Sequence, residues 1–169
     1  KKDEKYYIFG IPIKRRVSEK AKRDVGLQFT SETQDQEVGR KAGTYIHSVM
    51  EKLISFYANK QGNIYAIKKE VIGGEFKIKE RDFTELENLA KDLVSQIKKK
   101  KKKIDPTKKA IIRPEFFVVN PKNNIGGTID LFALFSNGTA SIYDYKTRRP
   151  YDKDDANVTT SSGLNLTSD

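Results

Sequence analysis

The sequence predicts an α/β (α+β) fold built around one core. Two segments, residues 44–58 and 83–103, carry apolar side chains at helical spacing. Three segments with the composition of strands follow them, at 111–119, 127–135 and 139–147. Helices followed by a run of strands are typical of this class. The chain has 169 residues, which is enough to bury a hydrophobic core.

The N-terminal half contains the first of these helices between less regular segments. Residues 6–13 predict one short strand that ends at Gly and Pro residues, and 14–34 a short helix with a loop. The helix at 44–58 has a single apolar stripe. Its members are Ile46, Val49, Met50, Leu53 and Tyr57. The glycines within 59–81 favour a strand or a mobile hairpin there.

The second helix ends in an unbroken run of lysines, Lys98–Lys103. Thr84 and Glu87 have the spacing of a capping box at its beginning. Lysines suit the negative end of a helix dipole, so we favour a solvated helix end for this run. The alternative, a track for a phosphate backbone, stays open.

The last two strands form a hairpin whose loop sets the register. Ser136-Asn137-Gly138 suits a three-residue loop, because glycine tolerates the left-handed position. Phe135 then pairs with Thr139, and counting back places Asp130 opposite Asp144. A two-residue loop would instead place these two carboxylates on opposite faces.

Two facing carboxylates repel one another, so either one keeps a proton or a cation lies between them. Oxygen ligands of this kind suit Mg²⁺ or Mn²⁺. Lys146 shares the face of Asp144 and could stabilise a hydroxide or the charge of a phosphate. The alternative is a surface Asp–Lys pair of little energetic weight.

Composition narrows the classes of function. Lys plus Arg number 33 and Asp plus Glu 23, a net charge of +10 that favours a polyanionic partner, usually nucleic acid. The absence of cysteine excludes disulfides, cysteine-bound zinc, iron–sulfur clusters and a thiol nucleophile. We expect an intracellular protein with no membrane-spanning segment, since no apolar stretch approaches about 18 residues. The polar segment 151–169 predicts a tail or truncated C-terminal part after a domain at 1–150.

Three motifs in order carry a resemblance to a known family. They are Gly43-Thr44-Tyr45-Ile46-His47 on the first helix, Gly127-Thr128-Ile129-Asp130-Leu131 on a strand, and Ile142-Tyr143-Asp144-Tyr145-Lys146-Thr147 on the next strand. Together they resemble the PD-(D/E)XK nuclease superfamily, and within it the RecB-like branch that includes lambda-exonuclease-like phage enzymes. The resemblance implies a restriction-endonuclease-like core, with a central mixed β-sheet flanked by helices.

The resemblance also implies a catalytic site for metal-dependent cleavage of phosphodiesters. His47, Asp130, Asp144 and the backbone carbonyl of Tyr145 would bind Mg²⁺ or Mn²⁺, and Lys146 would orient or activate the attacking water. Glu115 matches an acidic position of RecB-like sequences and would hold a second metal or a metal-bound water. A solvated glutamate is an equally open interpretation of Glu115. For His47, the only histidine, a structural role at the border of the apolar stripe stays open as well.

Four further cations are candidates for contacts with nucleic-acid phosphates, because they lie near the motifs: Arg40, Lys41, Arg148 and Arg149. The Gln-x-x-x-Tyr helix of RecB-like members is absent, since no Gln follows Gln96. We therefore expect the chain to be part of a larger protein or complex.

The leading hypothesis is a metal-dependent DNA nuclease, exonuclease or flap-type, in replication, recombination or repair. One alternative is an RNA endonuclease of the same superfamily, of the kind associated with viral polymerases. Another is a catalytically silent nucleic-acid-binding domain. The intact Asp130, Asp144 and Lys146 argue against that last alternative.

Overall fold

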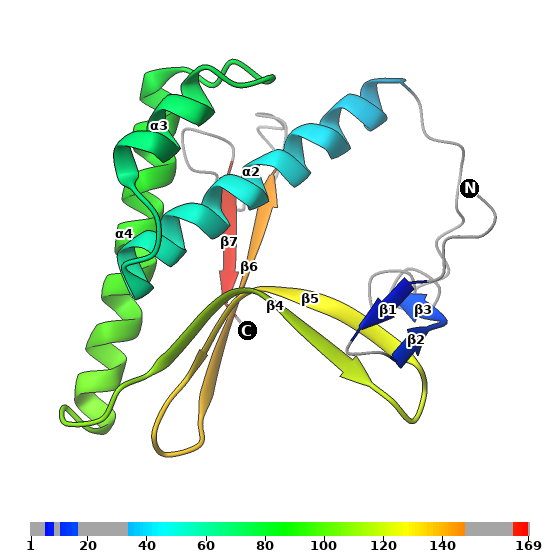
Figure 1. Ribbon diagram of the computed structural model, residues 1–169. Coiled ribbons are helices and arrows are strands. Elements are labelled where there is room, and N and C mark those ends of the chain that lie inside the picture. Colours follow the sequence, from blue (N-terminus) through cyan, green and yellow to red (C-terminus); the bar gives the residue numbers. More distant parts are fainter. Residues whose placement is uncertain (1–5, 9–10, 17–33, 148–163, 169) are drawn as a thin grey trace, which may run out of the picture.

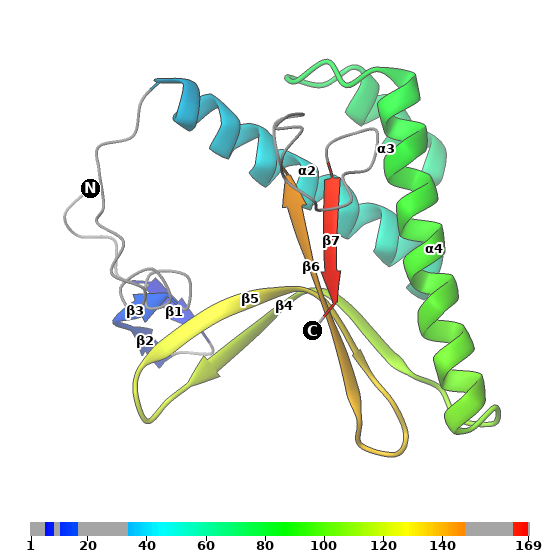
Figure 2. The ribbon, with the colours of Figure 1, turned by 180° about the vertical axis from the view of Figure 1, so that it is seen from behind.

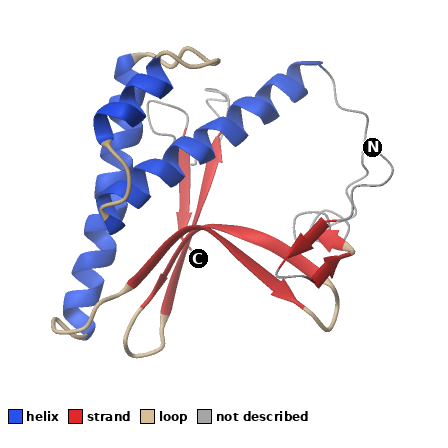
Figure 3. Cartoon of the chain, in the orientation of Figure 1, coloured by secondary structure: helices blue, strands red, loops and turns tan. Residues whose placement is uncertain are grey.

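The computed structural model describes residues 6–8, 11–16, 34–147 and 164–168. This part of the chain has an α+β architecture in which the helices gather on one face of a β-sheet (Figures 1 and 3). The helices are α2 (Gln34–Asn59), α3 (Ile64–Ile72) and α4 (Glu80–Ile104). The strands are β1 (Tyr6–Ile8), β2 (Ile11–Ile13), β3 (Arg15–Arg16), β4 (Ile111–Asn120), β5 (Ile125–Leu134), β6 (Ala140–Thr147) and β7 (Leu164–Ser168).

The main sheet is mixed, as the resemblance implied. Its centre is the antiparallel unit β4–β5–β6, and β7 adds an antiparallel strand beside β6. The short β3 pairs with β5 in parallel. Strand β4 pairs only with β5 in the described part of the chain, an edge position in which a strand tolerates a proline such as Pro114.

The N-terminal segment differs from its prediction. Residues 6–13 form two strands, β1 and β2, in a small antiparallel sheet of their own, not one strand. Of the helix and loop expected at 14–34, the structure describes β3 and the first residue of α2, and residues 17–33 lie outside the described residues.

Helices α2 and α4 bury their apolar stripes against the sheet. Helix α2 contributes Val49, Met50, Leu53 and Ile54, which confirms most of its predicted stripe. Helix α4 contributes Phe83, Leu86, Ala90, Leu93, Val94 and Ile97. The sheet contributes Ile112, Leu131, Ala133, Tyr143 and Tyr145. Each large side chain buried here stabilises the fold by about 1.5–3 kcal/mol, so this layer of contacts fixes α2 over the strands. No helix of the described residues is long and apolar enough to cross a membrane.

The strand or hairpin predicted within 59–81 is wrong, because α3 occupies the middle of that segment. The Asn63 side chain caps this helix by accepting hydrogen bonds from the backbone N–H groups of Tyr65 and Ala66. Ile67 and Val71, one helical turn apart, are buried in the core. The helix has only nine residues, so its apolar stripe is too short to outweigh the surrounding glycines in a sequence pattern.

The capping box predicted at Thr84 and Glu87 is also wrong, because α4 begins one turn earlier. The Thr84 hydroxyl donates to the carbonyl of Glu80 inside the helix, and Glu87 accepts from the Tyr57 hydroxyl. Glu80 and Asp82 lie in the first turn, where their negative charges interact favourably with the positive end of the helix dipole.

The β5–β6 hairpin has the predicted loop and register. The Phe135 N–H donates to the Thr139 carbonyl at 2.9 Å, and Gly138 has a φ of +84°. The ladder runs from Leu134 opposite Ala140 to Leu131 opposite Tyr143. Counting one step further along both strands places Asp130 opposite Asp144, one position beyond the last paired residues.

The Asn63 cap gives the first testable prediction. Replacing Asn63 with Ala leaves two N–H groups of α3 without their acceptor, so the free energy of unfolding should fall by about 1 kcal/mol. Urea denaturation measures the change, and Asn63→Ser is the control that keeps a capping oxygen. If Asn63→Ala is as stable as wild type, the cap contributes nothing to the fold.

Candidate active site

The sheet opens around Asp130. Strand β4 pairs with β5 on both sides of Glu115 in one unbroken register, but Glu115 and Asp130, which face each other in that register, are not paired. On the other edge of β5 the ladder with β6 ends at Leu131 and Tyr143. Beyond that point β6 turns away from β5 and rises towards α2 (Figures 1 and 2). Glu115, Asp130 and Asp144 thus occupy one row across three strands, where the ladders leave room for side chains.

The backbone of Glu115 departs from strand geometry. Its φ is +49°, a left-handed value that strains a residue with a Cβ by about 1–3 kcal/mol. Phe116 stacks on Phe132 with ring centroids 4.7 Å apart. Phe132 lies between two buried residues of β5, so it points away from the core, whereas strict alternation from buried Ile112 would point Phe116 towards it. The side-chain alternation of β4 therefore changes at Glu115.

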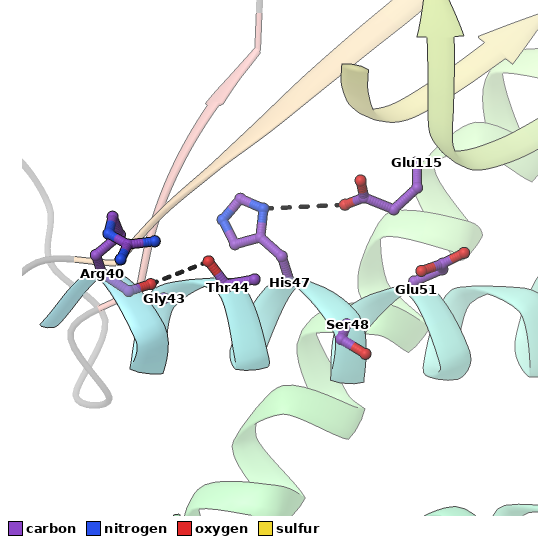
Figure 4. Close-up of a pocket in the computed structure, with 7 residues that line it drawn as sticks. All are labelled: Arg40, Gly43, Thr44, His47, Ser48, Glu51 and Glu115. Carbon is purple, nitrogen blue, oxygen red and sulfur yellow. Dashed lines mark hydrogen bonds and ion pairs between the residues drawn. The ribbon is translucent and has the colours of Figure 1, made fainter. Parts of the chain in front are cut away.

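Helix α2 places His47 opposite this row. Its Nδ1 lies 3.2 Å from Oδ1 of Asp130 and 4.0 Å from Oε1 of Glu115, and Figure 4 shows the imidazole and the Glu115 carboxylate facing each other. The other Asp130 oxygen accepts from the backbone N–H of Tyr145 at 2.7 Å. One ligand atom from each of His47, Glu115 and Asp130 can be chosen so that all lie within 4.8 Å of one another.

Burial and charge set the protonation of Glu115. Burial raises its pKa to about 7, and the negative charges of Asp130 and Glu51 act in the same direction. His47 opposes the increase without cancelling it. Glu115 is therefore only partly ionised near neutral pH unless a cation takes the place of its proton.

Asp130 and His47 stabilise each other's charged form. Burial would raise the pKa of Asp130, but hydrogen bonds with His47, with the Asp144 side chain and with the Tyr145 N–H hold it below its usual value. The hydrogen bond to Asp130 raises the pKa of His47 despite burial, with smaller contributions from the charges of Asp130 and Glu115 and from the Tyr145 backbone. Asp130 is therefore ionised at the centre of the cluster.

A polar hollow of about 620 Å³ adjoins the cluster (Figure 4). It is lined by Arg40, Gly43, Thr44, His47, Ser48, Glu51 and Glu115. All of these except Glu115 lie on α2, where they recur at each helical turn, and the apolar stripe of the helix faces the core. A ligand can therefore reach His47 and Glu115 from solvent.

The structure brings most of the predicted site residues together. His47, Glu115 and Asp130 form the cluster, the Tyr145 backbone bonds Asp130, and Asp144 bonds Asp130 from outside the three-residue group. Arg40 lines the hollow, whereas Lys41 is exposed and does not. Lys146 follows in β6, but its side chain lies outside the described part of the structure, as do Arg148 and Arg149.

Sequence reasoning gave too little weight to three polar residues that line the hollow with His47: Thr44, Ser48 and Glu51. The available signal was helical spacing, since Thr44 lies three residues before His47, Glu51 four residues after it, and Ser48 four residues after Thr44. Glu51 also raises the pKa of Glu115, so its charge acts on the cluster directly.

The chemistry of the cluster fits a divalent cation. Two carboxylates supply hard oxygen ligands, which suit Mg²⁺ and Mn²⁺, and an imidazole is a better ligand for Mn²⁺ than for Mg²⁺. The side chains are 27% exposed for His47, 25% for Glu115 and 11% for Asp130, so the group is partly desolvated and still accessible.

Comparison with known proteins gives one positive result. Residues 20–166 match the family model of the PD-(D/E)XK nuclease superfamily. No curated protein and no solved structure matches the chain. The matched region covers most of the chain and contains the opened sheet, helix α2 and every residue of the His47–Glu115–Asp130 cluster. The chain therefore belongs to the PD-(D/E)XK nuclease superfamily.

Proposed function

We propose that the domain is a metal-dependent DNA nuclease of the RecB-like branch, an exonuclease or flap-type enzyme that acts inside the cell in replication, recombination or repair. The observation that carries the proposal is the convergence of His47, Glu115 and Asp130 at a solvent-accessible hollow. Superfamily membership supports phosphodiester hydrolysis as the reaction. The order of the Gly-x-x-x-His, Asp and Asp-x-Lys motifs favours DNA over RNA and supports the branch.

The proposed metal ligands are His47, Asp130 and Glu115, with Asp144 and the Tyr145 carbonyl completing the set. Asp130 holds the centre, because it is ionised and fixed by three hydrogen bonds. A bound Mg²⁺ or Mn²⁺ would polarise a phosphoryl oxygen and lower the pKa of a water molecule. Glu115 releases its proton when a cation binds. Lys146 is assigned to the attacking water, and Arg40 at the rim of the hollow to a phosphate of the substrate.

The central test removes the Asp130 charge. We expect Asp130→Asn to lose Mn²⁺ binding in isothermal titration and to lose cleavage of DNA, because the remaining ligands would lack the ionised carboxylate at the centre of the cluster. Asp92→Asn, an exposed position on α4, removes the same charge and should keep both properties.

Wild-type cleavage is measured on single- and double-stranded DNA and RNA. Cleavage of RNA alone would replace the DNA proposal by an RNA endonuclease. Binding of nucleic acid with no Mn²⁺ binding and no cleavage would show a silent binding domain instead.

Lys146 is tested by separating metal binding from turnover. A residue that acts on the attacking water should lower the rate about a hundredfold or more when removed, without changing the affinity for Mn²⁺. Lys146→Ala should therefore bind Mn²⁺ as wild type does and cleave much more slowly. Equal cleavage rates for variant and wild type would remove Lys146 from the mechanism.

The protonation of the cluster predicts a pH-dependent stability of the metal-free protein. Glu115 has a folded pKa of about 7 against an ordinary value of 4.5, so its favourable contribution is complete below pH 4.5 and is lost as the pH rises through 7. The raised pKa of His47 acts in the same direction around neutral pH. With EDTA, the free energy of unfolding should fall by roughly 2–3 kcal/mol between pH 5 and pH 8.

Urea denaturation at both pH values checks this dependence. Glu115→Gln should show a flatter profile, because the amide does not titrate. Addition of Mn²⁺ should stabilise wild type more at pH 8 than at pH 5, since the cation competes with protons. A flat wild-type profile would show that Glu115 is not protonated in the folded state at neutral pH.

A further inference from the structure

A second charged surface lies on the C-terminal half of α4. Two hollows, of about 560 Å³ and 360 Å³, adjoin this part of the helix and share Lys98 and Lys102. We call their lysines together the lysine groove. Its members are Lys60, Lys91, Lys98, Lys99, Lys101, Lys102 and Lys109.

Three elements build the groove. Helix α4 supplies most of the lysines, Lys60 directly follows α2, and Lys109 lies two residues before β4. The C-terminal end of α4 and the beginning of β4 lie side by side in both ribbon views (Figures 1 and 2). Ile97 and Ile112, both buried, lie beneath the larger hollow. The ammonium groups therefore surround a fixed concave surface.

Few carboxylates lie near the groove: Glu87 forms an ion pair with Lys91, and the Asp105 carboxylate interacts electrostatically with Lys101. Neither hollow is lined by an Asp or Glu residue. Within the described ranges, Lys91 is the one member that forms an ion pair, with Glu87 at 3.7 Å. Lys101 donates to the Pro106 carbonyl. Like charges four residues apart, such as Lys98 and Lys102, destabilise an isolated helix, and a bound polyanion would relieve that repulsion.

The dimensions suit a nucleic-acid backbone. At 1.5 Å per residue, the stretch from Lys91 to Lys102 spans roughly 16 Å, which is about five base pairs of a duplex. His47 and Lys60 lie on or next to the same helix, α2, and the chain between them extends roughly 20 Å at that rise. No residue of the groove lines the hollow beside His47.

We propose that the lysine groove binds the phosphate backbone of nucleic acid at a position separate from the active site. The identity of the bound polymer rests on the proposed function, whereas the charge and shape of the groove are independent of it. A substrate long enough to span both places, roughly six base pairs or more, would be held by the groove while its scissile phosphate lies near His47.

The test compares two variants that lose the same charge. Lys98→Gln/Lys102→Gln removes the lysines shared by both hollows, and Lys69→Gln/Lys122→Gln removes two exposed lysines elsewhere. Fluorescence anisotropy measures the binding of 20-nucleotide single-stranded and 20-base-pair DNA in EDTA between 50 and 300 mM NaCl. Circular dichroism establishes that both variants are folded.

We expect the groove variant to bind duplex roughly tenfold more weakly at 0.1 M salt, with a log–log salt dependence shallower by about 2. The control variant should stay within about twofold of wild type. An equal loss in both variants, or an unchanged salt dependence, would overturn the proposal. So would stronger competition by polyglutamate than by an oligonucleotide of equal charge, which would point to an acidic protein partner.

Cleavage of a p-nitrophenyl phosphodiester separates the groove from the nuclease activity. This small substrate cannot reach the groove, so the groove variant should hydrolyse it at the wild-type rate with Mn²⁺. If wild type fails to cleave any substrate while the groove variant still loses DNA binding, the groove stands and the nuclease proposal falls. Slower hydrolysis of the small substrate by the groove variant would place those lysines at the active site and overturn the separation.

Discussion

The contacts of Asp130 hold the site together. One oxygen binds His47 of α2 and the other accepts from the backbone of Tyr145 in β6, while Asp130 itself belongs to β5. A single carboxylate thus joins a helix and two strands at the place where their ladder ends. The hydrogen bonds of Asp130 replace the strand pairing that is lost there. They also keep the carboxylate ionised although only 11% of its side chain is exposed. The same carboxylate therefore orients the His47 side chain and contacts β6 where that strand leaves β5.

The cluster is held in an arrangement that is unfavourable without a cation. Glu115 combines a left-handed backbone with a burial that raises its pKa to about 7. The strained backbone opposes folding at any pH, and burial opposes it where the carboxylate must ionise. Both features persist because the sheet on either side keeps its register and the core beneath is well packed. Strained backbone and displaced protonation at one residue are typical of a preorganised site, in which the fold places ligand atoms before the ligand arrives.

The motifs predicted much of this arrangement, and the reasons differ from residue to residue. Gly138 fixed the loop length, and with it the relation of Asp130 to Asp144, because a hairpin register is a local property. Helix α3 was missed since its capping residue and two buried side chains form too short a pattern. Glu115 was left with two open interpretations, because a change of alternation inside a strand depends on the neighbouring strand and leaves no local signal. The protonation states follow from burial, which only the folded chain defines.

Helix α2 connects the candidate active site and the lysine groove through the geometry of one rigid element. One of its faces packs on the core, and that packing prevents the helix from rotating or sliding over the sheet. Its polar face carries His47 at the active site, and its C-terminal end reaches the lysine groove, where the Asn59 side chain donates to the Ile112 carbonyl at the start of β4. The separation between the site and the groove is therefore set by helical rise rather than by a loop. A substrate bound at both places would therefore have a fixed length between its anchored phosphates and its scissile bond. The same packing that stabilises the fold would set the position of cleavage along the nucleic acid.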